Sequence, residues 1–344
     1  MSRLGSAVAN VGDSLAERTA MLGYLVPVDQ RRSLAELTDR LDLSVGEVGA
    51  KRSAFWIMLV LSAVIAISGV IGDSTATVIG AMIVAPLSLP ILGVALGVVT
   101  GRSALIGRSV VLVGAGVVVV VVLGFLFAQL LPNPVHVLSN AQVVGRTSPK
   151  LVDLTAAIAT GLVAAVAIAR RDVGDVLPGV AIAISLVPPL GVVGVCLGSH
   201  APALALGAFV LFASNVVAMI ITATIVLLGA GYAADAQAAA ARRGRSFAIL
   251  GAALVLVAIP MVINSLSTLW AGQIAEATGD WLRDEPGAQV TDVTLQSDTA
   301  TISVLGPEQL PPVEELQRRV DDLVPWNPTV VIVHNVGARV QPNR

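Results

Sequence analysis

Long apolar stretches, separated by short polar ones, fill the middle of the chain. A helix that crosses a bilayer needs about 20 mostly apolar residues. Seven stretches come close to or exceed this length, at residues 53–70, 76–100, 104–131, 151–169, 176–198, 202–228 and 246–270. The pattern therefore predicts an α-helical polytopic membrane protein with seven transmembrane helices.

The polar ends of the chain have a different pattern. Residues 271–344 predict a small α/β domain, with helices at 270–282 and 312–324 and strands at 289–295, 300–305 and 329–333. Residues 1–52 predict a helical segment, because Ser33 with Glu36 and Ser44 with Glu47 each fit a capping box at a helix start. The predicted domains are thus 1–52, 53–270 and 271–344.

Composition supports a membrane location and narrows the functions. Hydrophobic residues make up 55% of the chain and charged residues only 13%, too apolar a balance for a soluble domain. Residues 271–344 carry 5 Arg against 11 Asp and Glu, so we expect no nucleic-acid binding. The three histidines and the single cysteine have no metal-ligand spacing, and we expect no metal and no cofactor.

Positive charge in the short loops predicts the orientation. Lys and Arg gather in alternate loops, at positions 51 and 52, 102 and 108, 170 and 171, and 242, 243 and 245. Cytoplasmic loops are the ones enriched in these residues. We therefore expect a multi-pass protein of the inner (plasma) membrane, with a cytoplasmic N-terminus and residues 271–344 extracytoplasmic.

Two of the apolar stretches resemble each other. GDST at 72–75 leads into VIGAMIVAPLSLP, and Gly174 with Asp175 leads into GVAIAISLVPP about one hundred residues later. Each motif lies in the second of three spans, so the halves are about 53–131 and 151–228. Because three is odd, the second half enters the membrane from the opposite side, which predicts a 3+3 inverted repeat like that of many secondary transporters.

Prolines inside these two spans predict a central site. Proline removes a backbone hydrogen bond, and the freed groups are tolerated at membrane depth only where protein or trapped water meets them. Paired breaks would offer backbone dipoles to an ion or polar solute. The predicted substrate-binding residues are Asp73, Ser74, Thr75, Pro86, Ser88, Pro90, Asp153, Ser185, Pro188, Pro189 and Asn215.

Structural roles compete with this interpretation. Proline commonly only kinks a membrane helix. Asp73 and Asp153 open their spans, where a carboxylate often caps the helix, and Ser88 and Ser185 are suited to capping the breaks. Asn215 lies mid-span, where its amide needs a partner on another helix or a solute.

The motifs GDSTATVIGAMIVAPLSLPILG and GVAIAISLVPPLGVVGV, followed by SNVVAMI, resemble the bacterial and archaeal membrane family called domain of unknown function 389. The resemblance covers roughly residues 50–230. Many family members are similar in having Asn-Ser-Thr where this chain has Asp73, Ser74 and Thr75. The resemblance implies a multi-span inner-membrane protein and supplies no substrate.

Two functions fit these observations. The first is a transporter or channel-like protein that moves a small polar solute or ion through the site at the two broken spans. The alternative is a non-transporting envelope scaffold or lipid-binding protein that acts through residues 271–344. We find no catalytic motif and expect no enzyme. Expected partners are membrane lipid, the unknown solute and further copies of the chain in a homo-oligomer.

Overall fold

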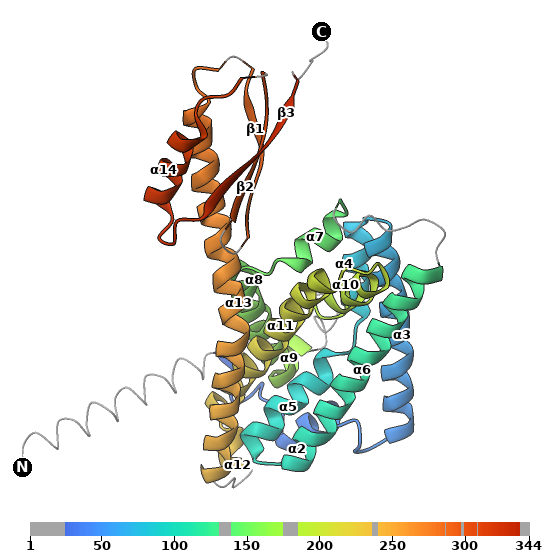
Figure 1. The fold of residues 1–344 in the computed structure, drawn as a ribbon. Coiled ribbons are helices and arrows are strands. Elements are labelled where there is room, and N and C mark those ends of the chain that lie inside the picture. The colour runs from blue at the N-terminus through green and yellow to red at the C-terminus, as the bar shows by residue number, and fades with distance from the viewer. Residues whose placement is uncertain are drawn as a thin grey trace, which may run out of the picture. The chain divides into compact units, whose positions relative to one another are not determined.

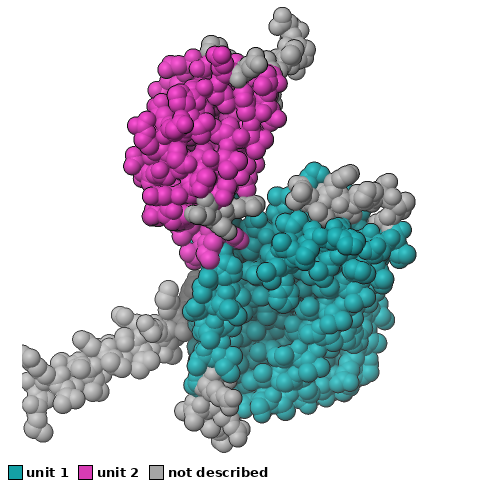
Figure 2. Space-filling model, in the orientation of Figure 1, with its two compact units in different colours: residues 1–261 teal, residues 262–344 magenta. Residues whose placement is uncertain are grey.

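The computed structural model describes residues 25–130, 139–174, 185–235, 240–285, 287–296, 299–307 and 309–337. Its helices and strands are drawn in Figure 1. The chain forms two compact units, residues 1–261 and 262–344, which are coloured separately in Figure 2. Each unit is described by itself.

The first unit is helical. Its helices are α2 (Leu34–Leu41), α3 (Val48–Ile71), α4 (Thr75–Val84), α5 (Ser88–Thr100), α6 (Ser103–Leu130), α7 (Ala141–Thr147), α8 (Leu151–Ala169), α9 (Arg171–Gly174), α10 (Val187–Gly198), α11 (Pro202–Gly229) and α12 (Tyr232–Asp235). Helix α13 (Ala240–Trp281) begins in this unit and ends in the second one.

Five helices are long and apolar enough to cross a membrane: α3, α6, α8, α11 and the stretch Phe247–Trp281 of α13. The pair α4 and α5, bent by 48°, makes a sixth if it counts as one span. The predicted span at 176–198 is described only in its second part, as the short helix α10, because residues 175–184 lie outside the described segments. The apolar helices fit a multi-pass membrane protein, while the seven-span count and the inverted repeat stay predictions.

The predicted break in the second span is confirmed, and Pro86 explains it. Helix α4 ends at Val84, and Ala85 has an extended backbone (φ −66°, ψ 122°). A residue before proline avoids the helical conformation because the proline ring clashes with it. Pro90 lies in the first turn of α5, where a missing N–H costs nothing. The chain thus bends at Pro86 alone.

The core of this unit is built around α5 and α10. Each of these two short helices packs against both α6 and α11. The backbones of α10 and α6 lie close together because each helix has a glycine at the contact. A Cβ at Gly194 would lie 2.3 Å from the carbonyl oxygen of Val121 and 2.8 Å from the Cα of Gly124. Small residues spaced along a helix allow such backbone contact in membranes.

The segment before α3 lies at the end of the unit opposite to α7 (Figure 1). The capping box of Ser33 and Glu36 at the start of α2 is confirmed. The one predicted at Ser44 and Glu47 is wrong, because no helix starts there and α3 begins only at Val48 without a side-chain cap.

Basic residues of three loops contact this N-terminal segment. Lys51 pairs with Asp39, Arg108 pairs with Asp42, and Arg171 pairs with Glu36. Cations from three of the four groups that the charge pattern assigned to one side of the membrane therefore lie together at one end of the helical unit.

The second unit is a small α/β structure, in which the three predicted strands and the helix predicted at 312–324 are confirmed, while the helix predicted at 270–282 is the last part of the long helix α13. Strands β1 (Gln289–Gln296), β2 (Thr299–Gly306) and β3 (Thr329–Val336) form a sheet in the order β1-β2-β3, with β1 antiparallel and β3 parallel to β2. Helix α14 (Val313–Leu323) connects β2 to β3. The predicted turn at 297–298 lies outside the described residues. The core includes Trp281, Ile302, Leu316 and Val320.

Candidate functional site

A cavity of about 360 Å³ lies among α4, α7, α8 and α11, and we call it the Asn215 cavity. Its polar wall consists of Arg146, Asp153, Thr160, Ser185 and Asn215, and Met82 at the end of α4 also lines it. Three of the predicted site residues, Asp153, Ser185 and Asn215, are thus brought together from three parts of the chain. A roomy cavity with several polar groups is of the kind that holds water or a polar ligand.

Asn215 joins this cavity to the predicted second break. It is 5% exposed, on α11, and its Nδ2 donates a hydrogen bond to the backbone carbonyl of Ser185 at 2.8 Å. Ser185 precedes the start of α10 by two residues. A buried amide is costly without partners, and here a backbone carbonyl outside any helix supplies one. Both groups lie on the cavity wall.

Arg146 brings positive charge to the cavity. Its Nη1 donates hydrogen bonds to the backbone carbonyl and the Oε1 of Gln142, at 2.8 and 3.0 Å, and both acceptors are neutral. Its Nε is buried and has no partner among the described residues. Burial lowers the pKa of this guanidinium, but an arginine stays protonated in proteins. The cavity therefore contains a cation without a carboxylate bonded to it.

Asp153 and Thr160 line the α8 side of the cavity, and part of each is committed to the helix. One carboxylate oxygen of Asp153, Oδ2, accepts a hydrogen bond from the backbone N–H of Lys150 at 2.7 Å, in the first turn of α8. The hydroxyl of Thr160 donates to the carbonyl of Ala156 at 2.9 Å. The capping interpretation of Asp153 is therefore correct, and the same residue also lines the cavity.

Asp73, Ser74 and Thr75 lie outside the cavity, and Asp73 and Thr75 hold α7 in place. Ser74, rather than Asp73, is the N-cap of α4. Asp73 accepts a hydrogen bond from the backbone N–H of Gln142 at 3.1 Å, and Thr75 accepts one from its Nε2 at 2.8 Å. Since Gln142 is also the partner of Arg146, this motif positions the cavity's cation through one intermediate residue.

The predicted prolines and Ser88 are separated from the cavity residues. Pro86 and Pro90 line two other hollows, near the N-terminal segment. Pro188 and Pro189 are buried in the first turn of α10. Ser88 is buried at the start of α5.

Sequence reasoning missed Arg146, Thr160 and Gln142. In the sequence, Arg146 and Lys150 lie in a loop on the side of the membrane whose other short loops carry little positive charge. Positive charge in such a loop is the signal that could have identified Arg146. The described part of the chain contains no group of three His, Cys, Asp or Glu residues placed to hold a metal ion.

Comparisons with known proteins agree with the resemblance seen in the sequence. Residues 82–221 match the family described as Domain of unknown function (DUF389), a shorter range than the motifs suggested. A protein of Methanocaldococcus jannaschii, itself described as uncharacterized, is 28% identical over 175 residues, which cover 51% of this chain and 53% of that protein. This chain therefore matches about half the length of its relative. No solved structure matches it.

Proposed function

Since residues 82–221 are a DUF389 domain, carried by a chain with several apolar helices, we propose that this protein is a membrane transporter or channel-like protein. It moves a small polar solute or ion through the Asn215 cavity. The observation that carries this proposal is the convergence of Asn215, Ser185 and Arg146 on one cavity, between the end of α4 and the residues just before α10. The two-half inverted repeat belongs to the same proposal, supported by the reciprocal packing of α5 and α10 on α6 and α11.

The groups on the wall favour a solute with an acidic or carbonyl oxygen. Arg146 has donors to spare, and its bonded acceptors are neutral, so an anionic oxygen would gain a charge-assisted hydrogen bond there. Met82, four residues before Pro86, brings the end of α4 to the cavity wall, and Pro86 has no N–H to donate to a carbonyl of the preceding turn. Backbone freed in this way is the usual material of transporter sites.

The proposed orientation places the α2 end in the cytoplasm of a cell with this protein in its inner membrane. Its support is the gathering of Lys51, Arg108 and Arg171 on the N-terminal segment at that end. The second unit would then be extracytoplasmic. We propose no catalytic activity, and we keep lipid and further copies of the chain as expected partners.

Flux through proteoliposomes tests this proposal. The full chain is reconstituted, and the movement of a panel of small carboxylates, inorganic oxyanions and monovalent cations is measured with and without a membrane potential. We expect at least one oxygen-bearing anion to move faster than in protein-free vesicles, and the rate to fall in Asn215→Leu. If no member of the panel moves, or if flux is unchanged in Asn215→Leu, the proposed site is wrong.

The same experiment addresses the scaffold alternative. A non-transporting scaffold would show no flux with any solute, while a chain lacking residues 282–344 would lose its function in cells. The shortened chain still contains the helices that line the Asn215 cavity. If the protein is a transporter of the proposed kind, its flux should therefore persist.

A further inference from the structure

A second cavity, of about 470 Å³, lies at the α2 end of the helical unit, away from α7. It is lined by the turn after α2 and by residues of α3, α5 and α6. We call it the Arg52 cavity. Its polar lining includes Ser44, Arg52 and Arg108, and its apolar lining includes Trp56, Val111 and Leu112. The proposed function makes no use of this cavity.

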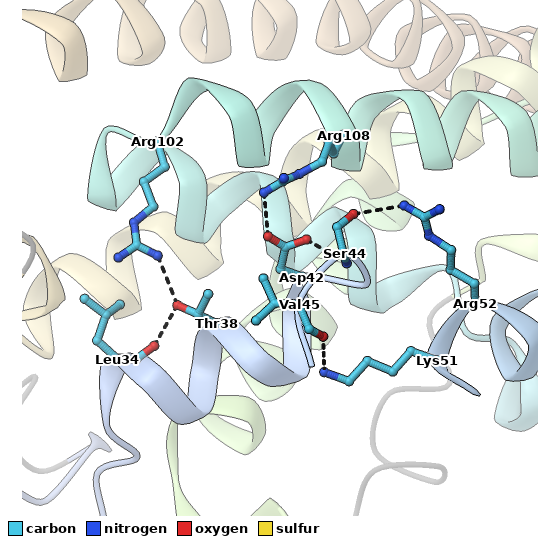
Figure 3. Close-up of polar contacts among 9 residues, drawn as sticks. All are labelled: Leu34, Thr38, Asp42, Ser44, Val45, Lys51, Arg52, Arg102 and Arg108. Atoms are coloured by element: carbon cyan, nitrogen blue, oxygen red, sulfur yellow. Dashed lines mark hydrogen bonds and ion pairs between the residues drawn. The ribbon is translucent and has the colours of Figure 1, made fainter. Parts of the chain in front are cut away.

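The charges around it do not cancel (Figure 3). Asp42 is 4% exposed and pairs with Arg108 at 2.7 Å, while Asp39 pairs with Lys51. Arg52, in contrast, donates to the hydroxyl oxygen of Ser44 at 3.1 Å. Arg102, which lines a neighbouring hollow, donates to the hydroxyl oxygen of Thr38 at 3.3 Å. The guanidinium group of Arg52 therefore has only a neutral partner among the described residues, and its positive charge is available to an anion.

The apolar residues of the cavity show that its arginines lie where the apolar parts of α3 and α6 begin. Arg52 is in the second turn of α3, one helical turn before Trp56, at the point where the apolar part of the helix begins. On α6, Arg108 precedes Val111, which is 71% exposed, and the apolar run that follows. Tryptophan at the end of an apolar span is typical of the boundary between lipid and water. The cavity thus places Arg52 and Arg108 directly beside exposed apolar surface of the membrane-like helices.

We propose that the Arg52 cavity binds the headgroup of an anionic phospholipid. The lipid phosphate would accept hydrogen bonds from Arg52 and from the free donors of Arg108, since a guanidinium recognises phosphate with two donors at once. The first methylene groups of the lipid would lie against Trp56 and Val111. Basic pockets between membrane helices are suited to such headgroups. A soluble anion would use the arginines but would leave the apolar wall in contact with water.

Lipid titration of the purified full chain in detergent tests this proposal. Phosphatidylglycerol or phosphatidylcholine is added, and bound lipid is counted by native mass spectrometry. We expect the protein to bind phosphatidylglycerol in preference to phosphatidylcholine. In Arg52→Gln the affinity for phosphatidylglycerol should fall about tenfold, the typical effect of one lost charge-assisted hydrogen bond. Arg108 is left unchanged because its removal would strand the buried carboxylate of Asp42.

Two further variants distinguish binding in the Arg52 cavity from a general electrostatic attraction of anionic lipid to this end of the protein. Gly107→Phe keeps every charge and fills the cavity, because Gly107 lines it and a Cβ there meets nothing within 4 Å. It should lose phosphatidylglycerol as Arg52→Gln does. Arg171→Gln removes one positive charge from the same end of the unit but outside the cavity, and it should bind normally.

Three results would overturn the proposal. The first is phosphatidylglycerol binding by Arg52→Gln or Gly107→Phe equal to that of the unchanged protein. The second is an equal loss in Arg171→Gln, which would mean that charge attracts lipid without a site. The third is release of the bound lipid by inorganic phosphate alone, which would identify a phosphate site instead.

Discussion

The break between α4 and α5 and the residues just before α10 differ in what contacts their backbone carbonyls. At the first, between α4 and α5, the carbonyl of Ala81 accepts a hydrogen bond at 2.8 Å from the hydroxyl of Ser62, and both residues are fully buried. At the second, before α10, the carbonyl of Ser185 accepts its hydrogen bond from Asn215, and both residues line a cavity. A break alone is therefore no site. A break becomes a candidate site where the side chain that hydrogen-bonds its free carbonyl also lines a polar cavity.

The largest effect should come from the cation of the Asn215 cavity. Arg146→Gln keeps a hydrogen-bonding amide but removes the charge, so the flux of an anion should fall at least about tenfold. The assay is transport into proteoliposomes. Arg318→Gln is the matched control, because Arg318 is an exposed arginine of the second unit. Equal flux in Arg146→Gln and the unchanged protein would remove the positive charge from the mechanism.

The comparison of the two breaks is tested by Asn215→Leu and Ser62→Ala. Each change leaves one backbone carbonyl without its side-chain donor, which should lower the free energy of unfolding by about 1–3 kcal/mol for the buried carbonyl of Ala81 and by less for that of Ser185, which is half-buried on the cavity wall. Thermal denaturation measures this loss. Flux should fall only in Asn215→Leu, because only Asn215 borders the cavity. If Ser62→Ala lost flux to the same extent as Asn215→Leu, the distinction between the two breaks would be wrong.

The position of α10, which follows the second break, depends on its contact with α6. Gly194→Ala places a methyl group 2.3 Å from a backbone oxygen, so the helices must separate, at a cost of about 1–3 kcal/mol. Gly114→Ala on α6 is the control, since nothing lies within 4 Å of its Cβ position. The expected result is a lower denaturation temperature for Gly194→Ala alone. The same temperature for both variants would contradict the close packing.

The smallest effect concerns the N-terminal segment, far from the Asn215 cavity. Hydrogen bonds from the backbone N–H of Ser33 and from Arg171 lower the pKa of the Glu36 carboxyl. A carboxylate with a lowered pKa stabilises the fold above its ordinary pKa, and this contribution is lost as the pH falls through the lowered value.

We therefore expect faster hydrogen exchange in α2 on acidification below about pH 4. Glu36→Gln should show the faster exchange already at neutral pH, with flux unaffected. Exchange in α2 that is independent of both pH and this substitution would show that the Glu36 contacts do not hold the helix.

The two compact units also differ in how far their sequence predicts them. In the second unit, polar residues interrupt the apolar ones in regular patterns, which identify β1, β2 and α14 to within one residue and β3 from its start, three residues short of its end. In the first unit most positions are apolar, and hydropathy locates the long helices but not the side that faces a cavity. Helix α7 was missed because seven residues in a polar loop carry no such signal.

The polar exceptions were the most informative residues of the first unit. Asn215 and Ser185 were predicted to share a site because an amide at mid-span needs a partner, and they do share a cavity. Pro188 and Pro189 were expected to lie at a break of the fifth span; they lie in the first turn of α10, and the preceding residues 175–184 are outside the described part of the chain. Arg146 is placed by contacts with Gln142 and the GDST motif, which are distant in sequence and cannot be read from local pattern.

Thiol labelling within the Asn215 cavity tests the central claim most directly. Thr160→Cys is made together with Cys196→Ala, and the protein in proteoliposomes is treated with a charged, membrane-impermeant thiol reagent. Thr224→Cys, at a position 1% exposed on α11, is the control. We predict rapid labelling at position 160, none at 224, and loss of flux after labelling at 160. A Thr160→Cys protein as unreactive as Thr224→Cys, or one that transports normally once labelled, would contradict a solute path through this cavity.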